Sequence, residues 1–125
     1  GKQVRRLWQN RTLANHHGGM VLVDGYVYGT NDRGLVCLDF ETGEVAWATS
    51  AVGKGAIVAA DNRLYVYGEK EGVVSLVAPD PKRCRIEGRL RITEGKRQHW
   101  AHPVVADGRL YIRHGEVLMA FDIRR

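Results

Sequence analysis

The stretch MVLVDGYVYG, Met20–Gly29, places an Asp-Gly pair between two short apolar runs. Such a pair tolerates the positive φ values of a tight two-residue turn, so the stretch predicts a β-hairpin. The same arrangement returns as AIVAADNRLYVYG and HPVVADGRLYIRHG, in which Asp61 and Asp107 stand where Asp24 stands in the first hairpin. Three related hairpins in one chain of 125 residues indicate an internal repeat.

A further strand follows each hairpin at a regular distance. This distance is nine, ten and nine residues for the pairs Tyr28–Cys37, Tyr65–Ser75 and Tyr111–Ala120. The first two units continue into a fourth strand, EVAWAT and IEGRLRI. Units of about 40 residues with four antiparallel strands are typical of β-propeller blades. We therefore expect an all-β propeller segment in one domain, with blades at residues 16–49, 53–93 and 99–123.

The two ends of the chain suggest how the third blade is completed. VRRLWQN near the N-terminus looks like the last strand of a blade, whereas the third unit stops before its own last strand. We expect residues 4–8 to form a closing strand that completes the third blade. Because three blades cannot close a ring, we expect a homodimer with six blades about a twofold axis. The alternative is that the chain is the C-terminal fragment of a longer single-chain propeller.

One segment carries a family resemblance. CLDFETGEVAW, Cys37–Trp47, resembles the signature A-x-D-x-x-T-G-x-x-x-W of the PQQ-like propeller repeat, with cysteine in place of alanine. The residues that match the signature are Asp39, Thr42, Gly43 and Trp47. Thr-Gly is expected to form the turn, and Trp47 is expected to dock between neighbouring blades. Trp8 is expected to play the same role in the N-terminal strand.

The PQQ-like family contains quinoprotein alcohol dehydrogenases and the non-enzymatic propellers of outer-membrane assembly. The resemblance implies a periplasmic or other extracytoplasmic location, although the chain shows no signal peptide. It also raises PQQ with calcium as a cofactor. The vicinal cysteine pair of those enzymes has no match, because Cys37 and Cys84 are far apart, and neither Ser50 nor Ser75 lies in a G-x-S-x-G motif. We expect a non-catalytic binding scaffold, with a PQQ-dependent dehydrogenase as the alternative.

Polar side chains recur at one position of the repeat. His16 and His99 each stand eight residues before the aspartate of their hairpin turn, and the next position holds His17, Lys54 or Trp100. These positions precede the first strand of each blade, which lines the central axis in propellers, so they should lie at one mouth of the channel. The expected ligand-binding residues are His16, His17, Lys54, His99, Trp100 and His102.

The chemistry of these residues favours a small polar or anionic ligand, or a protein partner. Metal ligation is not expected, because no suitably spaced carboxylate accompanies the histidines. The alternative is that the histidines only bind strand ends and loops. His114, in the short turn of IRHGEV, is assigned to the surface.

The net charge of +5 raises the possibility of a nucleic-acid partner, but its distribution argues against one. In the basic stretch Lys82–Arg97, alternation places Arg85, Arg89 and Arg91 on one face of a strand. This pattern is typical of a solvated outer strand. Nucleic-acid binding is therefore not expected. No apolar run reaches the roughly 20 residues that span a bilayer, so no membrane span is expected either.

Overall fold

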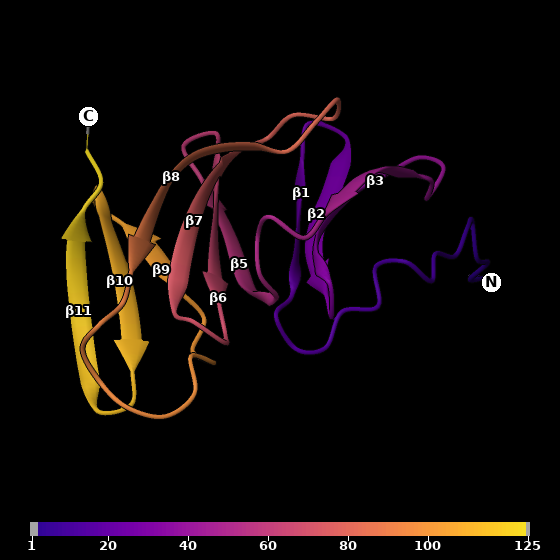
Figure 1. The fold of residues 1–125 in the computed structure, drawn as a ribbon. Coiled ribbons are helices and arrows are strands. Elements are labelled where there is room, and N and C mark those ends of the chain that lie inside the picture. The colour runs from indigo at the N-terminus through magenta and orange to yellow at the C-terminus, as the bar shows by residue number, and fades with distance from the viewer. Residues whose placement is uncertain (1–2, 125) are drawn as a thin grey trace.

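The computed structural model describes residues 3–124, which form three antiparallel sheets and no helix (Figure 1). Blade one has the order β1-β2-β3-β4 and blade two the order β5-β6-β7-β8, while β9, β10 and β11 make blade three. The strands are β1 (Met20–Val23), β2 (Tyr26–Asn31), β3 (Gly34–Asp39), β4 (Val45–Thr49), β5 (Gly55–Ala60), β6 (Arg63–Gly68), β7 (Val73–Ala78), β8 (Arg85–Arg91), β9 (Val104–Ala106), β10 (Arg109–His114) and β11 (Val117–Asp122). The predicted all-β class and four-stranded antiparallel blades are confirmed for blades one and two.

The hairpin turns have the backbone that their sequences predict. Asp24 and Gly25 have φ values of 47° and 82°, and Asp61 and Asn62 have 50° and 57°. Two successive positive φ values define a turn whose twist matches that of the strands on either side. Asp107 repeats this conformation at 51°, so the three hairpins share one turn geometry and one register.

The turn between β3 and β4 explains the Asp-Thr-Gly pattern. Asp39 Oδ1 accepts hydrogen bonds from the main-chain N–H of Glu41 (2.8 Å) and Thr42 (3.1 Å). The N–H of Gly43 donates to the Asp39 carbonyl at 2.8 Å, and Gly43 has a φ of 75° that favours glycine. The turn therefore needs a short acceptor side chain at its start and a residue without a Cβ atom at its end.

Apolar side chains fill the spaces between successive sheets. Tyr28, Leu35 and Cys37 of blade one meet Leu64 and Val66 of blade two in one buried cluster. A second buried cluster joins blade two to blade three, and its buried members are Tyr65, Tyr67, Val74, Ile92, Leu110 and Ile112. The core is thus a series of layers between blades, as the stacking of sheets requires.

Trp47 lies at the junction of blades one and two, where it was expected to dock. Its ring lies 6.0 Å from that of Tyr28, and its Nε1–H donates to the Asp80 carbonyl of blade two at 2.7 Å. Trp8 makes the corresponding contacts one blade earlier. Its Nε1–H donates to the Phe40 carbonyl at 2.9 Å, and its ring covers Gly43 so closely that a Cβ atom there would lie 2.4 Å from it. Both tryptophans therefore dock on the blade that follows their own segment.

The structure differs from the sequence prediction in the strand that contains Trp8. Residues 3–10 form no strand, and they lie beyond blade one, at the opposite end of the row from β11 (Figure 1). Within one chain, residues 4–8 therefore do not complete blade three, which has three strands in the described part of the chain. The docking of Trp8 on blade one holds this segment where the last strand of a preceding blade would lie.

The first strands of the blades lie side by side along the row, with β1 next to β5 and β5 next to β9. Glycines permit this approach, because a Cβ atom on Gly18 would lie 2.2 Å from the Gly55 carbonyl oxygen. The buried Thr30 hydroxyl donates to that oxygen at 2.8 Å and accepts from the Gly55 N–H at 3.1 Å. The loops that precede the first strands are thereby brought to the same end of the molecule. No helix among residues 3–124 is long and apolar enough to cross a membrane.

Candidate functional site

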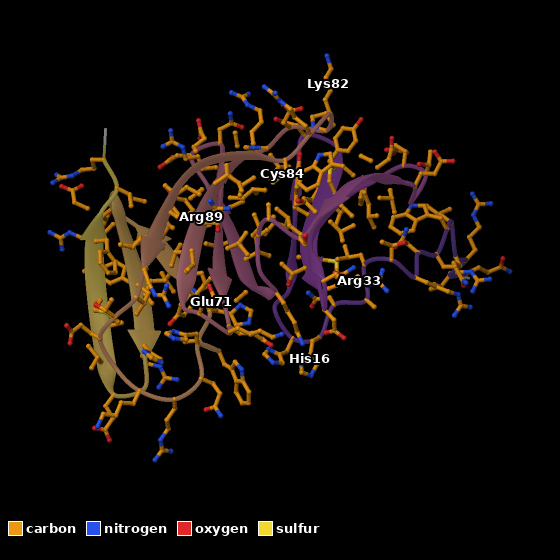
Figure 2. The ribbon with its side chains drawn as sticks, viewed as in Figure 1. His16, Arg33, Glu71, Lys82, Cys84 and Arg89 are labelled. Atoms are coloured by element: carbon orange, nitrogen blue, oxygen red, sulfur yellow. The ribbon has the colours of Figure 1, made fainter. Side chains whose placement is uncertain are left out.

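The turn before β1 presents two histidines to solvent. Asn15 shapes this turn, since its Nδ2 donates to the carbonyls of Gly19 (3.1 Å) and Thr30 (3.0 Å) and its Oδ1 accepts from the Gly19 N–H. His16 and His17 project from the turn so formed, and both are exposed. Figure 2 shows His16 at the end of the molecule opposite Lys82. The NHHGG stretch therefore fixes its backbone with Asn15 and leaves its imidazoles free to contact other molecules.

Four of the six predicted site residues come together here. The rings of His16 and His17 have centroids 4.3 Å apart, and the Trp100 ring lies edge-on to His17 with a centroid distance of 5.7 Å. His102 Nε2–H donates to the His17 carbonyl at 3.1 Å, because a carbonyl can only accept. We call His16, His17, Trp100 and His102 the mouth cluster. It joins the loop before blade one to the loop before blade three, with all four side chains exposed.

Lys54 does not join the mouth cluster as a free cation. Its ammonium group binds Asp32 Oδ1 at 2.9 Å and Glu69 Oε1 at 3.4 Å. The hydrogen bond with Asp32 is the main cause that raises the pKa of Lys54, and the same bond lowers the pKa of Asp32. The two acidic residues belong to turns of blades one and two, so Lys54 connects adjacent blades and its charge is compensated.

His99, the repeat equivalent of His16, points into the protein. Its ring stacks on that of His114 with a centroid distance of 3.6 Å and an interplanar angle of 20°. The hydroxyl of Tyr67 is hydrogen-bonded to His99 Nδ1 at 2.5 Å, and the ring lies over Gly72. Burial lowers the pKa of His99, and the neighbouring His114 lowers it further. His99 is therefore set apart from the mouth cluster as a neutral, half-buried imidazole.

The assignment of His114 to the surface is wrong, since its side chain is buried with an exposure of 6%. The alternation of β10 carries the signal that would have placed it correctly. Leu110, Ile112 and His114 are separated by two residues each, so they share one face of the strand, and all three are buried. The neighbouring turn suggests exposure, whereas the parity of the strand places His114 on the buried face.

The described histidines, cysteines and carboxylates are not gathered into a metal-binding group. Among residues 3–124, no three His, Cys, Asp or Glu side chains are grouped so that they could hold a metal ion. Cys37 and Cys84 are free thiols, and burial raises the pKa of Cys37 to about 11. A thiol with such a pKa stays protonated and unreactive at neutral pH. PQQ with calcium therefore stays an expectation of the family resemblance.

These features define the class of protein. Stacked four-stranded antiparallel sheets, first strands that lie side by side, and tryptophans that dock on the following blade are those of a PQQ-like β-propeller segment. The family model described as "Outer membrane protein assembly factor BamB" matches residues 2–84, and the chain belongs to this family.

The comparison with solved structures agrees with the fold. A total of 29 solved chains match, among them the crystal structure of BamB from Moraxella catarrhalis, with a TM-score of 0.64 and 24% sequence identity. The match covers 83% of this chain and 32% of that BamB, so the chain spans about a third of its length. At this identity the likeness concerns the fold alone. The comparison with curated proteins gives no match.

Proposed function

We propose that the chain is part of a non-catalytic, BamB-like propeller that binds a partner protein through the mouth cluster. The supporting observation is that exposed rings from two different blades are held against one another at the ends of the first strands. Aromatic side chains provide a large contact area and have few rotatable bonds to be fixed on binding. A rigid sheet framework that carries such loops is a common basis of recognition.

The mouth cluster itself contains no lysine or arginine, which favours a protein over a small anion as its ligand. Lys54, the cation that would have attracted an anion, is already paired with Asp32 and Glu69. The remaining groups are imidazoles and an indole, which combine apolar surface with hydrogen-bonding edges. The description of the family as an outer membrane protein assembly factor supports a partner in that process and a location in the periplasm.

Site-specific photo-crosslinking tests this proposal directly. A photoreactive amino acid is placed at Trp100, at His17 or, as a control, at the exposed Lys82 at the opposite end of the molecule (Figure 2). The proposal expects one and the same protein to be crosslinked from positions 17 and 100 and not from 82. The double variant His17→Ala/Trp100→Ala should lose that partner and keep the melting temperature of the parent protein. Equal crosslinking from all three positions would contradict the proposal.

We further propose that a second copy of the chain closes the ring. Blade three leaves the row of cross-strand neighbours Val104, Tyr111 and Ala120 without a covering sheet, and Val104 is 54% exposed. The equivalent row of blade two, centred on Tyr65, packs against blade three. Among the described residues, β11 is also an edge strand with no partner on its outer side. A sheet face with this apolar central row, flanked by Arg109 and Arg113, lies next to a free strand edge. Such a combination is suited to another blade of the same kind.

The mass of the protein in solution tests ring closure. Light scattering should give twice the 14.0 kDa of one chain. Ala120→Glu should shift the protein to the monomer, because it would put a charge into the new contact, whereas Lys82→Glu should not. A parent chain that is monomeric at all concentrations would overturn this closure and favour further blades supplied by a longer protein.

A further inference from the structure

His114 makes two hydrogen bonds that a neutral histidine cannot make together. Its Nδ1 lies 2.8 Å from the carbonyl oxygen of Glu94, and its Nε2 lies 2.7 Å from the carbonyl oxygen of Arg97. Carbonyl oxygens only accept hydrogen bonds, so each bond requires a hydrogen on the ring nitrogen. A neutral imidazole has one N–H and an imidazolium has two. Both contacts can be hydrogen bonds at the same time only when His114 is an imidazolium.

The surroundings of His114 are consistent with this charge. His99 stacks on it, and burial together with the neighbouring His114 lowers the pKa of His99, which favours a neutral ring there. The Tyr67 hydroxyl lies 2.5 Å from His99 Nδ1, and burial raises the pKa of Tyr67 to about 12, so this hydroxyl is uncharged. The stack thus pairs one neutral and one charged imidazole and avoids two like charges in contact.

The other charged groups near the stack are exposed side chains. They lie on the loop that follows β8, on the β10–β11 hairpin and on the β6–β7 turn, and they are Glu94, Lys96, Arg97, Arg113, Glu116 and Glu71. Within residues 3–124, no carboxylate forms an ion pair with His114. The two carbonyl groups of the loop are therefore its direct electrostatic partners.

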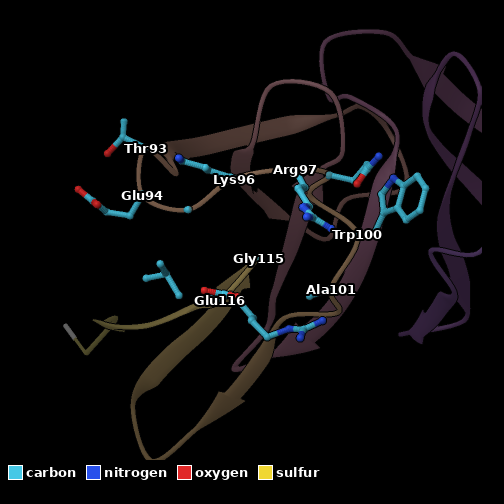
Figure 3. Close-up of a pocket in the computed structure, with 12 residues that line it drawn as sticks. Thr93, Glu94, Lys96, Arg97, Trp100, Ala101, Gly115 and Glu116 are labelled. Carbon is cyan, nitrogen blue, oxygen red and sulfur yellow. The ribbon is translucent and has the colours of Figure 1, made fainter.

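The loop is shaped around the His114 ring. Gly95 has a φ of 90°, and a Cβ atom there would lie 2.2 Å from the His114 carbonyl oxygen and 2.9 Å from its side chain. Arg97 has a φ of 76°, a conformation that costs free energy in a residue other than glycine. Figure 3 shows this loop, with Lys96, Arg97 and Trp100, along one side of an open pocket whose other side is formed by Gly115 and Glu116 of the hairpin. The two bonds to His114 hold the strained turn in place.

We propose that the second proton on His114 holds the turn of residues 94–97 in place, and with it Trp100, so that the mouth cluster is assembled at acidic pH and loosened as the pH rises. After deprotonation one ring nitrogen presents a lone pair to a carbonyl oxygen, and an attraction becomes a repulsion. Trp100 follows three residues after Arg97 on the same loop, and its ring contacts His17. The link to partner binding rests on the proposed function, whereas the link between protonation and loop position does not.

The hydrogen bonds of His114 determine the direction in which the stability of the loop changes with pH. The folded loop binds the protonated form of His114, so its stabilising contribution is present at low pH and is lost as the pH rises. The loss of one buried, charge-assisted bond should increase opening of the loop by about tenfold.

Nitrogen NMR of the imidazole rings provides the direct test, with no partner present. At about pH 5.5, both ring nitrogens of His114 should be protonated. As the pH is raised to about 8.5, one should lose its proton while the amides of residues 94–100 exchange about tenfold faster. A His114 with a single protonated nitrogen at the lower pH would overturn the proposal, whatever the crosslinking experiment shows.

Limited trypsin digestion gives a second readout with matched controls. Cleavage after Lys96 and Arg97 should rise with pH relative to cleavage after Lys82 and Arg83, which lie in a different exposed loop and correct for the pH dependence of trypsin itself. In His114→Gln the ratio should be high at every pH, and in Glu116→Gln, which removes an exposed titratable side chain of the neighbouring hairpin, it should follow the parent protein. A ratio that does not change with pH in the parent protein would refute the proposal. If His114→Gln does not fold, the parent protein and Glu116→Gln still decide the outcome.

Discussion

His16 and His99 occupy the same position in their repeats, yet one side chain is exposed to water and the other is stacked inside the protein. The loops that carry them account for the difference. Asn15 ties the turn before β1 to its own blade, whereas residues 92–103 extend from β8 to β9 and fold back over β10. The repeat register determines where a residue stands along the chain. The length and anchoring of the preceding loop determine where its side chain points.

The largest expected effect tests the stacking of blades that makes this comparison meaningful. Trp47→Ala should lower the free energy of unfolding by about 3 kcal/mol, because it removes a large ring from the contact between blades one and two. Urea denaturation measures this change. Val45→Ala on the same strand is the control, and at 41% exposure of Val45 it should cost less than about 1 kcal/mol. A loss below about 1 kcal/mol for Trp47→Ala would mean that the blades do not pack as described.

A smaller effect should sharpen the contrast between the exposed and the stacked histidines. Tyr67→Phe removes the hydroxyl beside His99 Nδ1 and leaves burial and His114, which lower the pKa of His99, in place. With the hydroxyl as donor to the neutral ring, its loss should raise that pKa toward its ordinary value. Since the hydrogen bond stabilises the neutral ring, the variant should lose about 1 kcal/mol above the ordinary imidazole pKa and less at acidic pH. Proton NMR titration and denaturation at two pH values measure both quantities. An unchanged His99 titration would show that this bond does not set its charge.

The smallest change in the free energy of unfolding is expected at His16, the exposed histidine. His16→Ala should change the free energy of unfolding by less than about 0.5 kcal/mol, because the imidazole is exposed and the turn is held by Asn15. His99→Ala should cost about 2 kcal/mol, since it leaves a void beside His114 and removes the acceptor of the Tyr67 hydroxyl. Thermal unfolding of the two variants side by side makes the comparison. Equal losses would remove the distinction between the two environments.

The features that sequence predicts well in this chain are local and repeated. The three aspartate turns, the four-stranded units and the docking of Trp47 each depend on a few neighbouring residues, and each appears as expected. The alternation that places Arg85, Arg89 and Arg91 on the exposed face of β8 is another example. Such patterns are determined by backbone preference and by the side on which a strand is buried.

The features that could not be predicted depend on contacts between distant segments. Lys54 forms ion pairs with Asp32 and Glu69, which lie in turns of two different blades. No spacing in the sequence predicts that pairing. The His99–His114 stack depends on how a long loop folds back. The placement of residues 4–8 depends on which blade receives Trp8, and its contact with Gly43 settles this within one chain. Completion of blade three by these residues remains a prediction about two chains.

The contact of Trp8 with Gly43 has a consequence for how such molecules grow. Blade one has a receptor for a tryptophan, formed by Gly43 and the Phe40 carbonyl, and it ends in a tryptophan of its own, Trp47. A duplication that copied one whole unit would copy both halves of this joint in the correct order. The contact between units would therefore be kept when a complete unit is inserted or lost. The number of blades could then change in evolution while the same interface is reused.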